Sequence, residues 1–367
     1  MTYFNTDEVD SALVNLSRND RNCELIELPE RSVEGVTCHA LRLGSRPTGT
    51  RDCVLLIGGV HAREWGSCEI LICFAADLLL AYRTGSGLAY GGRRFTADQV
   101  RGLLDNLEII VFPLVNPDGR RYSQNTEAMW RKNRNPAYGN GKGDCVGVDL
   151  NRNYDFLFDA ATAFSPTSGV RVSTDPCDPQ LYQGPQPFSE PETRNVRWLL
   201  DAYPRTRWFV DVHSYSEDML YVWGDDEDQS TDPSMNFGNH AFDGLRGDAG
   251  DARYREYIPA SDLAQATGLA RDFAAAVHGV RGTDYTAKSA FDLYPTCGSS
   301  DDYAFARHLT DPARGKVLAY TIEWGTEFQP QWDEMENIIK DISAGLLQFC
   351  VSARSMVGTR TAATTAA

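Results

Sequence analysis

Several features that would place a protein in a specialised class are missing from this chain of 367 residues. No apolar run approaches the roughly 18–20 residues that a membrane-spanning helix needs. Residues 1–10 contain no basic segment followed by an apolar one, so they do not encode a secretory signal. The nine cysteines are an odd number and form no Cys-x-x-Cys pair. We therefore expect mostly buried free thiols in a cytoplasmic protein, with a secreted protein that has lost its leader as the alternative.

Cationic side chains are scarce as well. The sequence has 35 Lys and Arg against 51 Asp and Glu, which gives a formal net charge of −16. Binding to nucleic acid needs a cluster of Lys and Arg that faces the phosphates, and anchoring to an anionic membrane needs a similar basic segment. We therefore predict no nucleic-acid partner and no membrane association. The hydrophobic fraction of 42% is ordinary for a globular protein with a large core, which excludes wholesale disorder.

Strands and helices alternate along the chain. Four short apolar runs are typical of buried strands, and four longer segments have the spacing of amphipathic helices. The expected strands are residues 53–57, 107–115, 208–212 and 317–322, and the expected helices are residues 68–81, 190–203, 264–277 and 333–351. This alternation predicts a single α/β domain, with a twisted, mixed but mostly parallel sheet and helices on both faces.

The predicted domain covers residues 1–353. The Thr- and Ala-rich residues 354–367 show no periodicity, and we expect them to form a disordered tail. Residues 139–147 are rich in Gly, and residues 225–262 are rich in Asp, Gly and Ser, so both segments have the composition of surface loops.

Polar side chains follow the carboxyl end of each expected strand. Ligands of parallel sheets bind at this edge, so these side chains are predicted to lie near one site. They are His61, Glu64, Asn116, Asp118, His213 and Glu323.

His61, Glu64 and His213 are the candidate metal ligands. Imidazole and carboxylate groups suit Zn²⁺, and a catalytic zinc site uses three protein ligands and one open position for water. His61 and Glu64 are three residues apart, a spacing that lets both side chains turn toward one point. A His-x-x-Glu pair also occurs by chance, and either residue would then be an ordinary surface or capping group.

Glu323 ends an apolar strand, where a carboxylate is costly to bury unless something compensates its charge. It is either a solvated residue at a strand end or a general base whose pKa is raised by partial burial. Residues 130–134 and 149–154 supply arginines, and the planar guanidinium group suits a carboxylate ligand. A solvated basic face is the alternative reading of these two segments.

Together these pieces resemble the zinc metallocarboxypeptidases of the pancreatic A/B type, over roughly residues 3–353. The resemblance implies the fold of that family, one Zn²⁺ per chain held by His61, Glu64 and His213, and a monomer. The matching motifs are His61-Ala62-Arg63-Glu64, Asn116-Pro117-Asp118-Gly119, Trp130-Arg131-Lys132, Asp149-Leu150-Asn151-Arg152-Asn153, His213-Ser214-Tyr215, Tyr294 before Gly298-Ser299-Ser300, and Glu323.

The resemblance also implies a role for the other motif residues. Glu323 is the expected general base, and Arg131 is the group expected to polarise the scissile carbonyl and stabilise the oxyanion. The residues expected to bind the substrate are Arg63, Asn151, Arg152, Tyr215 and Tyr294. Of these, Asn151 and Arg152 would hold the free C-terminal carboxylate, and Tyr294 would close over it.

Asp301 bears on specificity. In the family, the residue before an Asp-aromatic pair, here Asp302-Tyr303, lies at the base of the pocket for the terminal side chain. B-type enzymes carry Asp there and prefer C-terminal Lys or Arg. A buried carboxylate would favour a basic side chain through charge-assisted hydrogen bonds worth about 1.5–3 kcal/mol. The alternative is that Asp301 points away from the pocket or is already paired within the protein.

One segment departs from the family pattern, and one cysteine pair bears on the compartment. The acidic segment 225–262 is longer than in the digestive enzymes. Cys145 and Cys177 flank the carboxylate-binding motif where the family has a disulfide, and that bridge would require an oxidising compartment.

We therefore expect a zinc-dependent exopeptidase that hydrolyses the C-terminal bond of peptides or proteins and prefers a terminal Lys or Arg. Two other functions stay open at this point. One is an amidohydrolase of the same fold that acts on cell-wall peptides or N-acyl amino acids. The other is a non-catalytic homologue that binds peptides.

Overall fold

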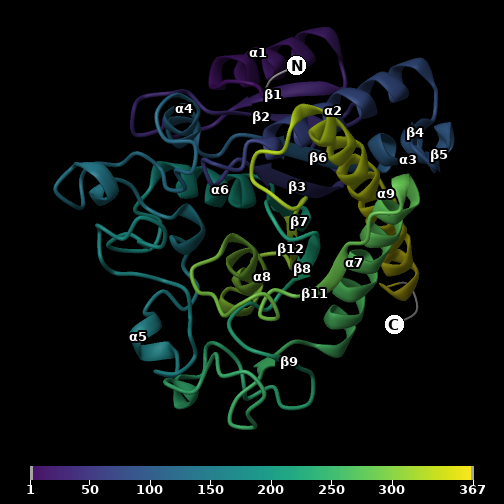
Figure 1. Ribbon diagram of the computed structural model, residues 1–367. Helices are drawn as coiled ribbons and strands as arrows, with labels where there is room; N and C mark the ends of the chain where they lie inside the picture. The colour runs from purple at the N-terminus through teal and green to yellow at the C-terminus, as the bar shows by residue number, and fades with distance from the viewer. Residues whose placement is uncertain (1–2, 365–367) are drawn as a thin grey trace.

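The four apolar runs of the sequence form neighbouring strands at the centre of one mixed sheet (Figure 1). The computed structural model describes residues 3–364. Its main sheet has eight strands, which are in spatial order β1 (Cys23–Glu27), β2 (His39–Leu43), β6 (Leu107–Phe112), β3 (Asp52–Gly58), β7 (Thr206–His213), β12 (Leu318–Glu323), β8 (Asp218–Tyr221) and β11 (Thr286–Ser289). Strands β6, β3, β7 and β12 run parallel, whereas β2 joins β6 and β8 joins β12 in antiparallel register. The predicted α/β class and mixed sheet are confirmed.

Helices cover both faces of this sheet. The longer helices are α1 (Thr6–Asn19), α2 (Gly66–Thr84), α3 (Ala97–Asn106), α4 (Pro117–Asn125), α6 (Pro191–Ala202), α7 (Ala260–Arg281), α8 (Ser300–Thr310) and α9 (Trp332–Thr364). On one face α9 packs against α2 and α7, and on the other α8 lies against β7 and β12 (Figure 1). None of these described helices is both long enough and apolar enough to cross a lipid bilayer. The apolar core lies between the helices and the sheet, and its central strands are almost fully buried.

The end of the chain differs from the sequence-based expectation. All four predicted helices are present, but α9 continues to Thr364 and therefore extends well into the segment expected to be a disordered tail. The segment contains no proline, and Met356 still packs against the core, so nothing stops the helix at residue 353. Residues 365–367 of the predicted tail lie outside the described residues.

Short elements occupy the two predicted loops. Residues 139–147 contain the 3₁₀ turn η1 (Gly143–Cys145), and residues 225–262 contain β9 (Asp228–Gln229), η3 (His240–Phe242), β10 (Glu256–Tyr257) and the start of α7. The acidic segment is organised around Arg246, whose side chain is fully buried. Arg246 donates to Asp243 at 2.8 Å and lies over the ring of Tyr254. The remaining short elements are β4 (Leu88–Tyr90), β5 (Arg93–Phe95), η2 (Leu150–Arg152) and α5 (Ala160–Ala163).

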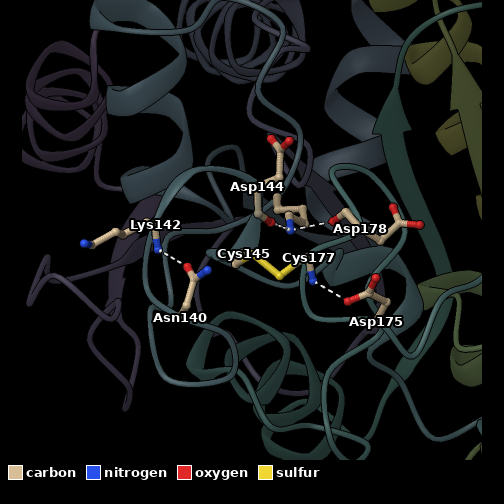
Figure 2. Close-up of a disulfide and its surroundings, with 8 residues drawn as sticks. Asn140, Lys142, Asp144, Cys145, Asp175, Cys177 and Asp178 are labelled. Atoms are coloured by element: carbon tan, nitrogen blue, oxygen red, sulfur yellow. Dashed lines mark hydrogen bonds between the residues drawn. A yellow bond between two sulfur atoms is a disulfide. The ribbon is translucent and has the colours of Figure 1, made fainter.

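A disulfide between Cys145 and Cys177 joins η1 to the loop between α5 and α6 (Figure 2). Lys132 strengthens the same junction, because its buried ammonium group donates to the backbone oxygens of Asp144 and Asp178, each at 2.7 Å. Burial lowers the pKa of Lys132 to about 8. The free cysteines are Cys23, Cys38, Cys53, Cys68, Cys73, Cys297 and Cys350, and all but Cys73 are buried. The bridged pair and the seven free cysteines together make up the nine cysteines of the sequence.

Replacing both Cys145 and Cys177 by Ser is expected to lower the free energy of unfolding by about 2–4 kcal/mol. The bridge closes a loop with a sequence separation of 32 residues, and opening it lets the unfolded chain regain conformational entropy. Urea unfolding followed by circular dichroism measures the change. Cys73→Ser is the matched control and should alter the stability by less than about 0.5 kcal/mol. A double variant as stable as the parent would contradict the prediction.

Candidate functional site

Two sheet strands deliver the candidate metal ligands to one point. Strand β7 ends on His213, and β3 ends three residues before His61. Gly59 makes the turn after β3, because its φ of +63° suits glycine and a Cβ there would lie 3.0 Å from the backbone oxygen of Pro113. The turn brings His61 and Glu64 back over the carboxyl edge of the sheet, next to His213.

The side chains of His61, Glu64 and His213 converge with both imidazoles facing the carboxylate. His61 Nδ1 lies 2.7 Å from Glu64 Oε1, His213 Nδ1 lies 2.9 Å from Glu64 Oε2, and the two Nδ1 atoms are 3.0 Å apart. All three residues are at most 5% exposed. Among the described residues this is the one group of three or more His, Cys, Asp or Glu whose ligand atoms lie within 4.8 Å of one another. Nitrogen and oxygen atoms gathered in this way fit a Zn²⁺ ion.

Two further carboxylates lie behind the two histidines, on the side away from Glu64. His61 Nε2 lies 3.3 Å from Asp149 Oδ1, and His213 Nε2 lies 3.0 Å from Asp211 Oδ2. Both carboxylates are fully buried. Such a carboxylate orients a metal-binding imidazole and keeps its proton on the far nitrogen, which leaves Nδ1 free to bind the ion. The arrangement therefore fits zinc bound through Nδ1 of each histidine.

The pKa values of the cluster reflect its crowded charges. Burial lowers the pKa of His61, and the nearby Arg131 guanidinium lowers it further. Burial also acts to lower the pKa of His213, but the carboxylates of Asp211 and Glu64 outweigh it and hold that pKa well above its usual value. Burial alone would raise the pKa of Glu64, yet the two histidines pull it well below its usual value. Glu64 is therefore ionised, as a metal ligand must be.

Glu323 stands beside the cluster because of the strand register. It is the last residue of β12 and pairs with His213 across the parallel β7–β12 ladder. Burial raises the pKa of Glu323 to about 8, with Glu64 adding to the rise and His213 and Arg131 opposing it. A carboxyl group with a pKa near neutrality can both accept and donate a proton, which is the property of a general acid–base.

Arg131 is fixed on the opposite side of the cluster. Its Nε and Nη2 atoms donate to Asp149 Oδ2 at 3.1 and 2.9 Å. Asn116 belongs to the predicted Asn-Pro-Asp-Gly turn. Its amide nitrogen donates to the backbone oxygens of Val60, next to His61, and of Lys132, next to Arg131, and so joins these two segments. Asp149 therefore contacts Arg131 and His61 at once, which holds the cation and the metal ligand in a fixed relation.

A cavity of about 280 Å³ opens in front of the cluster and contains most of the predicted site residues. Its lining residues are His61, Arg63, Glu64, Arg131, Asn151, Arg171, Gln180, Leu181, Ser214, Tyr215, Leu293, Tyr294, Glu323 and Phe328. A larger cavity, about 620 Å³, lies between residues 155–163 and α8, and none of the predicted site residues lines it. The smaller cavity is therefore the candidate active site, because the predicted metal ligands and the predicted catalytic residues lie around it.

Two predicted substrate-binding residues do not line this cavity. Arg152 is 2% exposed, and it donates from Nε to the backbone oxygen of Arg171 at 2.6 Å and from Nη1 to that of Asn151. Asp301 is 3% exposed and lies in the first turn of α8. Its carboxylate accepts hydrogen bonds from Thr321 Oγ1 and from the backbone N–H of Asp302, both at 2.9 Å. Gly298, with φ +61°, permits the close approach of this region to the backbone of Arg152.

Four contributors to the site were missed by the sequence-based reasoning. Asp211 lies two residues before His213 in β7, so its side chain points to the same face of the strand, and the alternation of a strand was a usable signal. Gln180, Arg171 and Phe328 lie in loops and carry no such pattern. Gln180 accepts from Arg63 at 2.7 Å, and Phe328 lies under the same guanidinium group.

Comparison with known proteins supplies a family for this arrangement. A family model described as "Zinc carboxypeptidase" matches residues 11–344. Carboxypeptidase B of Astacus astacus is 30% identical over 324 residues, which cover 88% of this chain and 86% of that protein. Carboxypeptidase A2 of Rattus norvegicus is 35% identical over 176 residues, which cover 48% of this chain and 36% of the rat protein. The chain thus spans about a third of the rat protein but most of the crayfish one.

A solved structure agrees on the fold. The carboxypeptidase A from Helicoverpa armigera superposes with a TM-score of 0.71 over 96% of this chain and 74% of that chain. The sequence identity of this pair is 23%, so the likeness concerns the fold alone. The match of the family model, residues 11–344, includes the strands and loops that carry the metal cluster.

The Asp211→Asn variant is expected to bind zinc about 10- to 100-fold more weakly than the parent. The amide cannot stabilise the ring proton of His213 by charge, while it keeps the size of the side chain. Competition with a chromogenic chelator measures the affinity directly. Asp52→Asn, at the opposite end of the sheet, is the control and should leave zinc affinity unchanged. Equal zinc affinity of the Asp211→Asn variant and the parent would contradict the positioning role.

Proposed function

The chain belongs to the zinc carboxypeptidase family, and we propose that it removes single residues from the C-terminus of peptides. The observation that carries the proposal is one cavity that brings together a His-Glu-His cluster, a carboxyl group of raised pKa and an arginine. These are His61, Glu64 and His213, with Glu323 and Arg131 beside them. Peptide hydrolysis needs a polarised carbonyl, an activated water and a proton donor for the leaving amine, and this set provides groups for each task.

His61, Glu64 and His213 are the residues that would hold zinc. Zinc bound there would supply a Lewis acid for the scissile carbonyl and would lower the pKa of its bound water toward neutrality. The buried carboxylates of Asp149 and Asp211 keep the two imidazoles oriented for that purpose.

Glu323 moves the proton. Its carboxylate accepts a proton from the attacking water and returns it to the nitrogen of the leaving amine. The raised pKa of about 8 suits both halves of this task, because a group with a pKa near the operating pH exchanges its proton readily in either direction.

Arg131 and the residues around Asn151 orient the substrate. Arg131 faces the cavity while Asp149 fixes its guanidinium, so it can donate to the oxygen that becomes negative during attack. Asn151 and Arg152 are proposed to hold the terminal carboxylate, and Tyr294 covers the terminal residue. A site that requires a free carboxylate next to the scissile bond restricts hydrolysis to the last residue.

A preference for terminal Lys or Arg is proposed for the same site, on the strength of Asp301. Its two hydrogen bonds come from neutral donors, a hydroxyl and a backbone N–H, and no described Lys, Arg or His forms an ion pair with it. A buried carboxylate without a cation favours a ligand that brings one. The N-terminal end of α8 offsets part of the charge.

The Glu323→Gln variant tests the reaction. It is expected to bind zinc normally but to release C-terminal residues about 10²–10⁴-fold more slowly, because the amide cannot take the proton of water. The measurement is the release of free amino acid from a varied panel of peptides, with and without a chelator, while bound zinc is quantified separately. Parent protein that releases no C-terminal residue from any peptide, with zinc bound, would refute the proposed function.

Matched peptides that end in Arg, Lys, Phe or Leu test the preference. The parent should cleave the basic pair with the higher kcat/KM, and Asp301→Asn should reduce the ratio of Arg to Phe by about 10- to 100-fold. Asp302→Asn is the matched control, because its carboxylate accepts from Ser299 and Gly224 within the protein. Similar rates on Arg and Phe in the parent would remove the Asp301 argument and leave the reaction untouched.

A further inference from the structure

The larger cavity, of about 620 Å³, has an aromatic wall that the fold holds in place. The Phe188 ring packs edge-on against Tyr303, with the ring centroids 4.9 Å apart, and the backbone N–H of Phe188 donates to the oxygen of Asn153 at 2.7 Å. The Phe156 ring stacks on Trp223 with the centroids 5.4 Å apart. A cavity of this size with a mostly apolar lining is typical of the sites that bind small organic molecules.

Two residues of the wall have a backbone conformation that side chains rarely adopt. Leu157 has a φ of +45° and Phe188 a φ of +56°. This left-handed conformation is costly for a residue other than glycine, so it persists only where the surrounding contacts enforce it, and such residues are frequent at ligand-binding sites. The wall is therefore a built feature of the fold.

Three arginines gather around the Tyr303 hydroxyl at this cavity. They are Arg197 of α6, Arg307 of α8 and Arg314, which follows α8. Burial raises the pKa of Tyr303, whereas all three guanidinium groups act to lower it, so each lies close enough to influence that hydroxyl. Tyr303 is 5% exposed, and none of the described residues forms a hydrogen bond with its hydroxyl group. The cavity thus offers one hydroxyl donor surrounded by positive charge.

Of the three arginines, Arg197 has no anionic partner among the described residues. Its guanidinium carbon lies 4.5 Å from the centroid of the Phe188 ring, which is its one recorded side-chain contact within that part of the chain. By contrast, Arg307 pairs with Asp201, although its buried Nε has no hydrogen-bond partner, and Arg314 pairs with a neighbouring aspartate. A guanidinium group that rests on an aromatic face without a carboxylate is available to an anionic ligand.

The acidic residues that line the cavity do not neutralise Arg197. Asp159 caps the N-terminus of α5, and Asp243 forms an ion pair with Arg246. Asp155 also lines the cavity, but it is exposed, so water solvates its charge, whereas Arg197 is partly buried. The positive charge of Arg197 is therefore the one that a ligand in the cavity would meet with the least competition from water.

The larger cavity is separate from the candidate active site, and the two have no lining residue in common. One face of α8 borders it, because Tyr303, Ala306, Arg307 and Thr310 follow the helical spacing of three and four residues. Asp301 instead faces Thr321 on β12.

We propose that the larger cavity binds a small organic anion with an aromatic or other apolar body. The apolar body lies against the rings of Phe156, Phe188 and Tyr303. The oxygens of its carboxylate or sulfonate group accept from the Arg197 guanidinium and from the Tyr303 hydroxyl. This site takes no part in peptide hydrolysis, so it does not depend on the proposed exopeptidase function.

Calorimetric titration of the zinc-loaded protein with naphthoate tests the proposal. The neutral naphthamide and the cationic naphthylmethylammonium, substituted at the same ring carbon, separate the effect of the charge from that of the rings. Naphthoate should bind about 10-fold more tightly than either, because its hydrogen bonds are charge-assisted. Arg197→Met should weaken naphthoate binding by about 10-fold or more and change that of naphthamide by less than about 2-fold, since methionine keeps an apolar contact with Phe188.

Further variants locate the bound anion. Tyr303→Phe should weaken naphthoate binding by about 3- to 10-fold, the effect of one lost neutral hydrogen bond. Thr310→Trp places a large ring at an exposed lining position and should weaken naphthoate and naphthamide alike. Arg271→Met, an exposed arginine of α7 outside the cavity, is the matched control, and it and Arg131→Met in the active-site cavity should leave naphthoate binding unchanged. Thermal unfolding followed by circular dichroism verifies that each variant is folded.

Four results would overturn the proposal. Naphthoate could fail to bind at millimolar concentration, or it could bind the parent and the Arg197→Met variant equally well. Tighter or equal binding of naphthylmethylammonium would assign the cavity to cations through Asp155. A loss of naphthoate binding in Arg131→Met, with none in Arg197→Met, would place the anion in the active site. All of these readouts are binding affinities, so they are distinct from a failure of the protein to hydrolyse peptides.

Discussion

A chain of buried charged groups along the carboxyl edge of the sheet is the interaction on which the site depends. Carboxylates alternate in it with groups that carry or can take up a positive charge, and it links segments that are far apart in the sequence. Its members are, in spatial order, Arg131, Asp149, His61, Glu64, His213 and Asp211. Removing one partner of such a buried pair leaves an uncompensated charge and typically costs about 3–5 kcal/mol. The fold therefore holds the catalytic groups in place by the same contacts that make them expensive to disturb.

The balance of these charges explains why a divalent cation suits the site. When both histidines are neutral, Asp149, Glu64, Asp211 and Glu323 present up to four negative charges, and Arg131 is the arginine that forms an ion pair with one of them, Asp149. Asp211 and Glu64 raise the pKa of His213, whereas burial, helped by Glu64, raises the pKa of Glu323, and a proton on either group offsets part of that negative charge. A zinc ion supplies two positive charges at the point where the ligand atoms converge. Metal binding is therefore favoured by electrostatics as well as by the donor set.

The sequence predicted most of the scaffold and the catalytic centre because both depend on local patterns. Apolar runs predicted the central strands, and polar residues after their carboxyl ends predicted His61, Glu64, His213 and Glu323. The pairing of Asp301 with Thr321 could not be predicted, since it depends on how α8 docks on β12. The burial of Arg152 likewise follows from the path of the loop that carries Arg171. The helical end of α9 was missed because its residues show no amphipathic period.

The residues that the sequence predicted and those that it did not stand on different kinds of element. The metal ligands and the general base stand on or directly after strands, whose register leaves them little freedom. The groups proposed to contact the substrate stand on loops, and these loops are fixed by a disulfide, by the Lys132 ammonium and by single hydrogen bonds. Changes in such a loop alter which carboxylate or side chain is bound while the strand ends stay where they are. Relatives that share the metal centre can therefore differ in specificity, and the loop residues of each chain have to be examined separately to assign its substrate.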